Sequence, residues 1–183
     1  MAWDRLCQPK GTGGMGFRDL HLFNIALLGR QVWRLIHLKN TLCYRVLSSK
    51  YFPDGNIFRA KRVDKHEPLY TWSSIAQAAK ALENGYVWLV GDGKKFDIRH
   101  DKWGFDGLSG ESINHALLTD REKVVKDLWN QDQMEWNQER VCELFGRTVG
   151  DQICDLPISK GGFDDRLTWI HNPHGCYTSK SVL

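Results

Sequence analysis

The sequence predicts a mainly helical α+β fold with two small antiparallel β-hairpins. Apolar residues recur at helical spacing in the N-terminal half, which is typical of helices that pack on a core. Two stretches, 86–100 and 167–179, each place a turn rich in glycine or asparagine between segments with strand character. The 183 residues are enough for one domain or two small ones.

Three helices are expected in the first half of the chain. The first begins near Asp19, and the second covers 42–49, ahead of a Pro-Asp-Gly turn at 53–55. The third has Pro68 at its start, and Gly85 is placed to end it in a left-handed conformation. Its buried face is expected to consist of Trp72, Ile75, Ala79 and Leu82.

Two hairpins and several short helices are expected in the second half. The first hairpin pairs 86–90 with 96–100, and the second pairs 167–171 with 176–179. Between them, Thr119 and Glu122 are expected to form a capping box ahead of an apolar run. A helix capped by Asn137 follows and ends at Gly146, and another ends before Pro157.

Composition argues against several classes of protein. The apolar stretch from Leu20 to Ile36 is interrupted by polar residues, whereas a membrane span needs about 20 mostly apolar ones. The first residues contain no apolar segment, so we expect no secretory signal. Five scattered cysteines, an odd number, indicate reduced intracellular thiols and not a disulfide framework.

Charge is distributed unevenly along the chain. Residues 1–66 contain twelve Lys or Arg and four Asp or Glu, a net charge of +8. Residues 67–183 contain thirteen and eighteen, a net charge of −5, which gives +3 for the whole chain. This asymmetry predicts either a face for a polyanion or two parts that attract each other.

The positive signal for binding is a basic stretch with interleaved aromatic residues. Basic side chains neutralise phosphates, and aromatic rings stack on bases. The candidate nucleic-acid-binding residues are Arg30, Arg34, Lys39, Arg45, Lys50, Arg59, Lys61, Arg62 and Lys65. The interleaved aromatics are Trp33, Tyr44, Tyr51 and Phe58. The alternative is an ordinary solvated face whose aromatics all belong to the core.

Other motifs lack the context that their chemistry requires. Gly11, Gly13 and Gly16 spell a dinucleotide fingerprint, which leaves a small nucleotide-binding protein as an alternative, but no buried strand precedes them and no carboxylate follows at the expected distance. His171, His174 and Cys176 lack the second ligand pair of a structural zinc site. We therefore expect neither a dinucleotide nor a metal ligand set in this chain.

Catalytic motifs are missing as well. The paired aspartates of polymerases, which hold two metal ions, do not occur; the nearest dipeptide is Asp164-Asp165, in an expected loop. No nucleophile elbow, phosphate-binding loop or zinc-protease motif is present. The sequence thus predicts no catalytic residues.

Several motifs occur in an order that resembles the C-terminal part of plant LINE-type (non-LTR) retrotransposon reverse transcriptases. The N-terminal ones are Trp3-x-x-x-Cys7-x-Pro9-Lys10, Gly13-Gly14-Met15-Gly16-Phe17-Arg18-Asp19-Leu20, Phe23-Asn24-x-Ala26-Leu27-Leu28 and Gln31-x-Trp33-Arg34-Leu35. The central ones are Lys50-Tyr51-Phe52-Pro53, Tyr70-x-Trp72-x-Ser74-Ile75, Trp88-x-x-Gly91-Asp92-Gly93 and Asp101-x-Trp103. The last are Asp165-x-Leu167-x-Trp169 and Gly175-x-Tyr177-x-x-Lys180-Ser181. Arg99 departs from the pattern, because an aromatic residue is usual there.

This resemblance implies a region that runs from after the polymerase domain into the start of the zinc-binding reverse-transcriptase region. It implies three segments: a basic helical connector at 1–66, a helix plus hairpin at 67–108, and short helices leading into a truncated zinc-binding-type segment at 109–183. In the full-length family the polymerase lies upstream, and a zinc cluster and often an RNase H domain lie downstream of Leu183.

The function implied is that of a noncatalytic fragment of an RNA-directed DNA polymerase polyprotein, which contacts RNA or DNA or supports the polymerase. No cofactor, membrane or metal is expected for this chain. The family implies an intracellular location, in the nucleus or cytoplasm, with a mitochondrial copy as an alternative. The competing hypothesis is a degenerate retroelement remnant with no retained activity.

Overall fold

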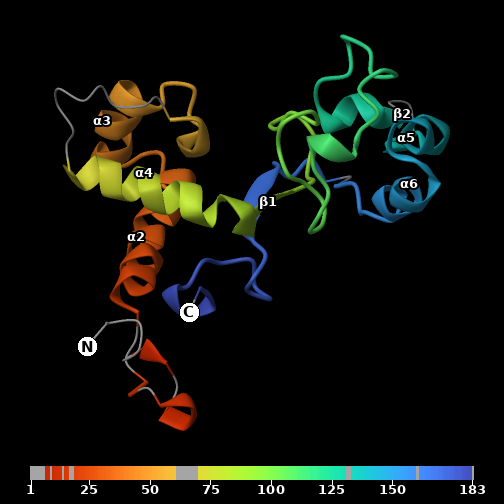
Figure 1. Ribbon diagram of the computed structural model, residues 1–183. Helices are drawn as coiled ribbons and strands as arrows, with labels where there is room; N and C mark the ends of the chain where they lie inside the picture. The colour runs from red at the N-terminus through yellow and green to blue at the C-terminus, as the bar shows by residue number, and fades with distance from the viewer. Residues whose placement is uncertain are drawn as a thin grey trace. The chain divides into compact units, whose positions relative to one another are not determined.

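A computed structural model describes residues 7–8, 10–13, 15–16, 19–60, 70–130, 133–159 and 161–182 of the chain (Figure 1). It forms two compact units: unit 1 comprises residues 1–84 and 171–183, and unit 2 comprises residues 85–170. The structure is 48% helical and contains two small antiparallel two-stranded sheets. The predicted fold class, mainly helical α+β, is confirmed. The segments 1–66, 67–108 and 109–183 stay a prediction about domain organisation.

Among the described residues, unit 1 is built on the helices α2 (Leu20–His37), α3 (Leu42–Tyr51) and α4 (Tyr70–Leu82). The first two begin where the sequence predicts, because Asp19 and Thr41 accept hydrogen bonds from the first free backbone amides. Three short 3₁₀ helices also belong to this unit: η1 (Lys10–Thr12), η2 (Ile57–Arg59) and η6 (Ser179–Ser181). Pro68 lies outside the described residues.

The core of unit 1 joins α2 and α4 through a stripe of small and branched residues. On α2 the buried positions are Ala26, Gly29, Val32 and Leu35. A Cβ at Gly29 would lie 2.1 Å from the Tyr177 hydroxyl, so only glycine allows this approach. Tyr177 donates a hydrogen bond of 2.9 Å to the Ala26 carbonyl, and its burial raises the pKa of the phenol to about 12. Tyr177 thereby ties residues after position 170 to α2.

The stripe predicted on α4 is confirmed, because all four of its residues are buried. The role predicted for Gly85 is wrong. After α4 the chain passes through the 3₁₀ helix η3 (Glu83–Gly85), and Gly85 does not have the positive φ of a left-handed cap. It packs instead under the Trp169 ring, where a Cβ would lie 2.1 Å from the nearest ring carbon. This glycine serves a close packing contact within unit 2.

Unit 2 contains helices α5 (Gln138–Phe145) and α6 (Arg147–Cys154), together with four short strands. Strands β1 (Tyr86–Leu89) and β4 (Arg166–Trp169) form one antiparallel sheet. Strands β2 (Trp129–Asn130) and β3 (Glu135–Trp136) form the other. The 3₁₀ helices η4 (Gly110–Ser112) and η5 (Val125–Leu128) lie between them in sequence. The buried core includes Phe96, Ile98, Trp103, Leu128, Trp136, Val141, Leu144 and Ile153.

Both predicted hairpin pairings are wrong. β1 pairs with β4, about eighty residues later, with Tyr86 opposite Trp169 and Leu89 opposite Arg166. Residues 96–100 do not pair with β1, because they face residues 123–124 instead: Ile98 donates its amide to the Lys123 carbonyl at 3.0 Å, and Asp97 forms an isolated antiparallel bridge with Val124. Residues 176–179 form no strand either, since Tyr177 docks on α2 in unit 1. Within the part of the chain that the structure describes, the strands that pair with a near neighbour in sequence are β2 and β3, a pairing that the sequence did not reveal.

The remaining helix predictions have mixed outcomes. Asn137 caps α5 by accepting from the Arg140 amide, and Gly146 ends that helix at φ 78°, so these two predictions are confirmed. At the predicted capping box, Glu122 accepts from the Thr119 amide at 2.9 Å, but the following residues form the 3₁₀ helix η5 and not an α-helix. Among the described residues, no helix combines the length and apolar character needed to cross a membrane.

Candidate nucleic-acid interface

The predicted basic residues that the structure describes all lie in unit 1 and are all exposed. Arg30 and Arg34 lie on α2, and Lys39 follows that helix. The other three are Arg45, Lys50 and Arg59, on α3 and at the end of η2. We call these six the basic surface. Lys61, Arg62 and Lys65 lie outside the described residues.

The geometry of α2 explains why its arginines reach solvent. Arg30 and Arg34 are four residues apart and therefore lie on one face of the helix. Val32 and Leu35, which are 0% and 5% exposed, point toward the core. The arginines thus occupy positions that the core stripe leaves free.

Several cations of this surface form no ion pair with any described side chain. Within the part of the chain that the structure describes, Arg30, Arg34, Lys39 and Arg45 have no ion-pair partner. Lys50 lies 5.4 Å above the Tyr51 ring in a cation–π contact. Unpaired cations in one region raise the local electrostatic potential and attract polyanions.

The aromatic residues among these cations belong mainly to the core. Tyr51 is 3% exposed and stacks on Trp72 with ring centroids 4.6 Å apart. Tyr44 is half-buried and meets Phe52 edge to face. Trp33, also half-buried, lies against His37 with centroids 3.9 Å apart. Tyr51 therefore follows the alternative interpretation, in which the interleaved aromatic residues belong to the core. The basic surface offers a ligand charged groups more than exposed aromatic rings.

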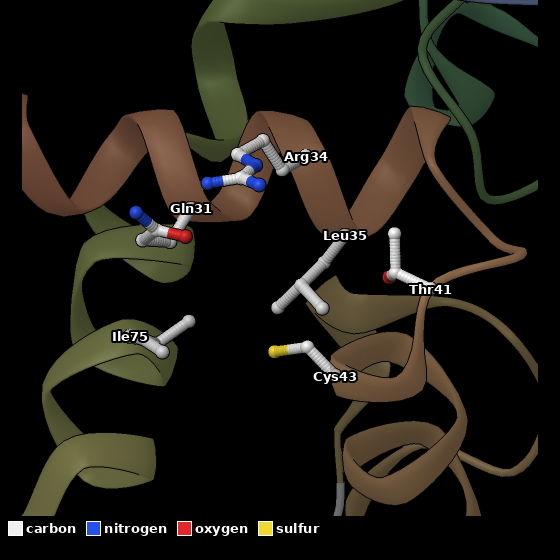
Figure 2. Close-up of a pocket in the computed structure, with 6 residues that line it drawn as sticks. All are labelled: Gln31, Arg34, Leu35, Thr41, Cys43 and Ile75. Carbon is white, nitrogen blue, oxygen red and sulfur yellow. The ribbon is translucent and has the colours of Figure 1, made fainter.

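A pocket opens beside the basic surface, between α2, α3 and α4 (Figure 2). Its volume is about 120 Å³, and its lining residues are Gln31, Arg34, Leu35, Thr41, Cys43 and Ile75. Figure 2 shows Leu35, Cys43 and Ile75 converging from three helices, with Gln31 and Arg34 above them on α2. Of the six, sequence reasoning identified Arg34 as a site residue. The other five carry no catalytic or ligand motif, and only the tertiary packing brings them together.

The charge asymmetry follows the two units of the structure. The sequence of unit 1 contains fourteen Lys or Arg and six Asp or Glu, a net charge of +8. That of unit 2 contains eleven and sixteen, a net charge of −5. The basic surface therefore belongs to a unit whose sequence is basic as a whole.

Asp165 has a structural role that the sequence reading missed. Its carboxylate is buried and accepts hydrogen bonds from the backbone amides of Gly91, Gly93 and Lys95, at 2.6, 2.8 and 2.8 Å. Gly93 has a positive φ of 67°, and this lets the loop curl around the carboxylate. Asp164 beside it is exposed and pairs with the Lys95 ammonium at 2.6 Å. The two aspartates thus act separately, Asp165 as a clamp for the β1–β4 sheet.

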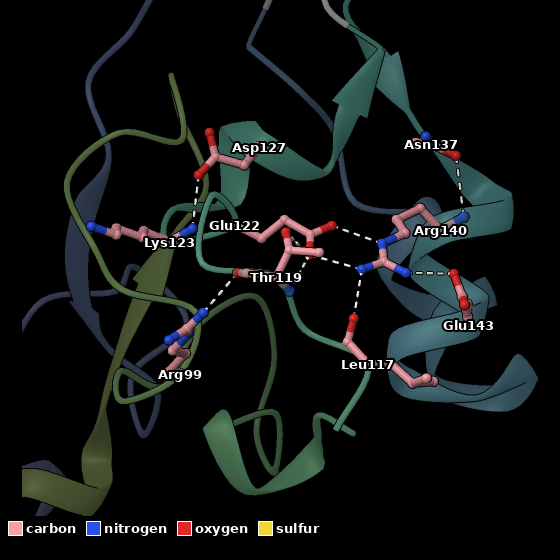
Figure 3. Close-up of polar contacts among 9 residues, drawn as sticks. All are labelled: Arg99, Leu117, Thr119, Glu122, Lys123, Asp127, Asn137, Arg140 and Glu143. Carbon is pink, nitrogen blue, oxygen red and sulfur yellow. Dashed lines mark hydrogen bonds and ion pairs between the residues drawn. The ribbon is translucent and has the colours of Figure 1, made fainter. Parts of the chain in front are cut away.

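A second polar cluster in unit 2 centres on Arg140 (Figure 3). Its guanidinium donates to both carboxylate oxygens of Glu122, at 2.7 and 2.8 Å, and also contacts Glu143 and the Leu117 carbonyl. The hydrogen bond from Arg140 is the largest cause that lowers the pKa of Glu122, from 4.5 to about 2. The same pairing raises the pKa of Arg140. Since every partner is satisfied within the fold, this cluster stabilises unit 2.

Other candidate sites are not formed. Asp19 fills the N-terminus of α2, accepting from the His21 and Leu22 amides at 2.7 and 3.2 Å, so those amides are not free for a pyrophosphate after the glycine run. Arg99, the departure from the family pattern, donates to the Thr119 carbonyl at 2.8 Å (Figure 3). Within the described ranges, no group of three or more His, Cys, Asp or Glu side chains is placed to hold a metal ion.

Comparison with known proteins finds two relatives, both from Arabidopsis thaliana. "Uncharacterized mitochondrial protein AtMg00310" is 39% identical over 107 residues, which cover 58% of this chain and 68% of the relative. "Putative ribonuclease H protein At1g65750" is 35% identical over 188 residues, which cover 98% of this chain but 29% of the relative. No family model matches the chain. No solved structure matches it. The two relatives support a retroelement-derived protein.

Proposed function

The chain belongs to the family of the mitochondrial protein AtMg00310, and from that premise we propose that it is a noncatalytic, nucleic-acid-binding segment of a retroelement reverse transcriptase. The region proposed is the one that follows the polymerase domain in plant LINE-type elements. Its partner is RNA or DNA, held by unit 1. In a full-length protein it would adjoin an upstream polymerase and downstream zinc-binding or RNase H parts.

The basic surface is the observation that carries this proposal. Six described cations are exposed in one unit, and four of them have no ion-pair partner among the described residues. Binding of a polyphosphate releases its condensed counterions, and this release drives association at low salt. The formal charge of +8 on the unit 1 sequence favours the same partner.

Salt dependence gives the proposal a measurable form. For single strands the slope of log K against log salt is about −0.7 for each phosphate contacted. If four to six cations of the basic surface contact phosphates, the slope is about −3 to −4. Affinity should then fall about fiftyfold to a few hundredfold between about 50 and 200 mM salt.

The experiment is a fluorescence-anisotropy titration of the full chain with a labelled single-stranded RNA of about 12 nucleotides. The double variant Arg30→Gln/Arg34→Gln should weaken binding and reduce the slope by about 1.4, because two phosphate contacts are lost. The matched control is Arg121→Gln/Lys123→Gln, which removes two exposed cations from unit 2. An equal effect of both double variants, or no binding at low salt, would reject the proposed site.

The competing proposal is a degenerate retroelement remnant with no retained activity. The chain spans 29% of the length of the ribonuclease H relative. A remnant that is not maintained by selection is expected to unfold without cooperativity and to leave its last 25 or so residues open to proteases. Cooperative unfolding with those residues protected would count against it.

A further inference from the structure

The pocket between α2, α3 and α4 has a size suited to one small ring. Its volume is about 120 Å³. An engineered protein cavity of about 150 Å³ holds benzene. A pocket of this size, open to solvent on one side, takes a six-membered ring more readily than the two fused rings of a purine.

The walls and the rim of the pocket differ in chemistry. Leu35 and Ile75 are 5% and 6% exposed and supply apolar surface for the faces of a ring. The Thr41 hydroxyl donates to the Leu38 carbonyl at 3.0 Å and accepts from the Tyr44 amide at 3.2 Å, so it is already committed to the fold. The polar groups left for a ligand are therefore those of α2.

Gln31 and Arg34 offer complementary chemistry at the rim. The Gln31 side chain has no hydrogen-bond partner within the described part of the chain, and its amide presents a donor beside an acceptor. The Watson–Crick edge of a pyrimidine also presents a hydrogen-bond donor beside an acceptor, so the amide donor can meet the base acceptor and the amide acceptor the base donor. Arg34 is exposed and unpaired among the described residues, so its guanidinium is available for an adjoining phosphate.

We propose that this pocket receives a single unstacked pyrimidine base of a single-stranded nucleic acid, with Gln31 hydrogen-bonded to the base edge and Arg34 to the adjoining phosphate. The inference rests on the nucleic-acid contact proposed above and adds a base preference to it. The basic surface holds the backbone without regard to sequence, and the pocket selects one base within the bound strand.

The test compares labelled oligouridylate and oligoadenylate of about 12 nucleotides, titrated with the full chain at low salt. Wild-type protein should bind oligouridylate at least about fivefold more tightly. Gln31→Leu removes the amide at similar size, and Cys43→Phe fills the pocket from the exposed start of α3; each should bring the ratio close to one. The change in this ratio is decisive, because adenylate stacking within the free RNA is the same for every variant.

Two controls separate the pocket from the basic surface. Lys39→Leu removes an exposed cation that does not line the pocket, so it should weaken binding of both RNAs equally and leave their ratio unchanged. Oligouridylate should also slow alkylation of Cys43 by N-ethylmaleimide, as measured by peptide mass spectrometry. The exposed Cys176 is the internal reference and should be unaffected.

The outcomes distinguish this inference from the proposed function. Failure to bind either RNA at low salt removes both. Equal affinity for the two RNAs, or a preference that survives Gln31→Leu and Cys43→Phe, overturns the pocket assignment and leaves the basic surface as a contact without sequence preference.

Discussion

Replacing Glu122 by glutamine should destabilise the protein, because this carboxylate is held by the Arg140 guanidinium. The fall of its pKa from 4.5 to about 2 corresponds to about 3 kcal/mol of preference for the charged form in the folded state. The two side chains are 12% and 22% exposed, so solvent screening is modest and we expect a loss of about 2–3 kcal/mol. Glutamine keeps the shape but places an NH₂ group against one of the guanidinium donors.

The pH dependence of this effect has a definite sign. A carboxyl group whose pKa is lowered on folding contributes its full stability above its unfolded value, here 4.5. That contribution is lost as the pH falls from 4.5 toward about 2, where the folded group also takes up a proton. The difference in stability between wild type and Glu122→Gln should therefore be largest near neutral pH and shrink across this window.

The assay is urea denaturation followed by tryptophan fluorescence, since Trp103, Trp129 and Trp136 are buried in unit 2. The matched control is Glu143→Gln, which removes another partner of Arg140 whose side chain is 49% exposed, and it should cost less than about 1 kcal/mol. A loss below about 0.5 kcal/mol for Glu122→Gln, or a difference that stays constant down to pH 2, would refute the reasoning.

Two further predictions concern the contacts that link distant segments of sequence within each unit. Asp165→Asn should lower the free energy of unfolding by about 2–4 kcal/mol, because the new NH₂ group would face one of three backbone amide donors. The control Asp164→Asn, on the surface, should lower it by less than about 1 kcal/mol. Thermal unfolding compares the two variants, and equal effects would contradict the role of Asp165 as a clamp. Tyr177→Phe should lower the free energy of unfolding by about 1 kcal/mol, because the hydrogen bond to the Ala26 carbonyl is lost, whereas Tyr70→Phe at an exposed position should have no effect. The stability advantage of the wild type should persist below pH 10 and disappear as the pH rises through about 12. An alkaline stability profile that is identical in wild type and Tyr177→Phe would exclude this.

The sequence predicts the helices of this chain well because their signals are local. Asp19 and Asn137 cap helices through amides two or three residues away, and Gly146 ends α5 by its own positive φ. The apolar stripe of α4 likewise needs only the helical repeat to be visible. Each of these features depends on fewer than about five neighbouring residues, so it can be read without knowledge of the tertiary fold.

The strand pairings were not predictable from the same kind of signal. Residues 96–100 have strand character and follow a Gly-Asp-Gly turn, which is typical of a local hairpin. In the structure the amides of that loop bind the Asp165 carboxylate, and this aligns β1 with β4. The pocket was hidden for a similar reason, because Gln31, Cys43 and Ile75 come together only when three helices pack.

The clamp also changes how two of the family-like motifs are interpreted. Trp88-x-x-Gly91-Asp92-Gly93 and Asp165-x-Leu167-x-Trp169 are far apart in sequence, yet the first supplies the amides and the second the carboxylate of one contact. Trp88 pairs with Leu167 in the same sheet. Because every polar partner in this contact is internal, these residues are explained by the stability of unit 2 and need no ligand. Selection for nucleic-acid binding would therefore act on unit 1, where Arg30, Arg34, Lys39 and Arg45 have no ion-pair partner among the described residues, and loss of their charge would abolish binding without unfolding the chain.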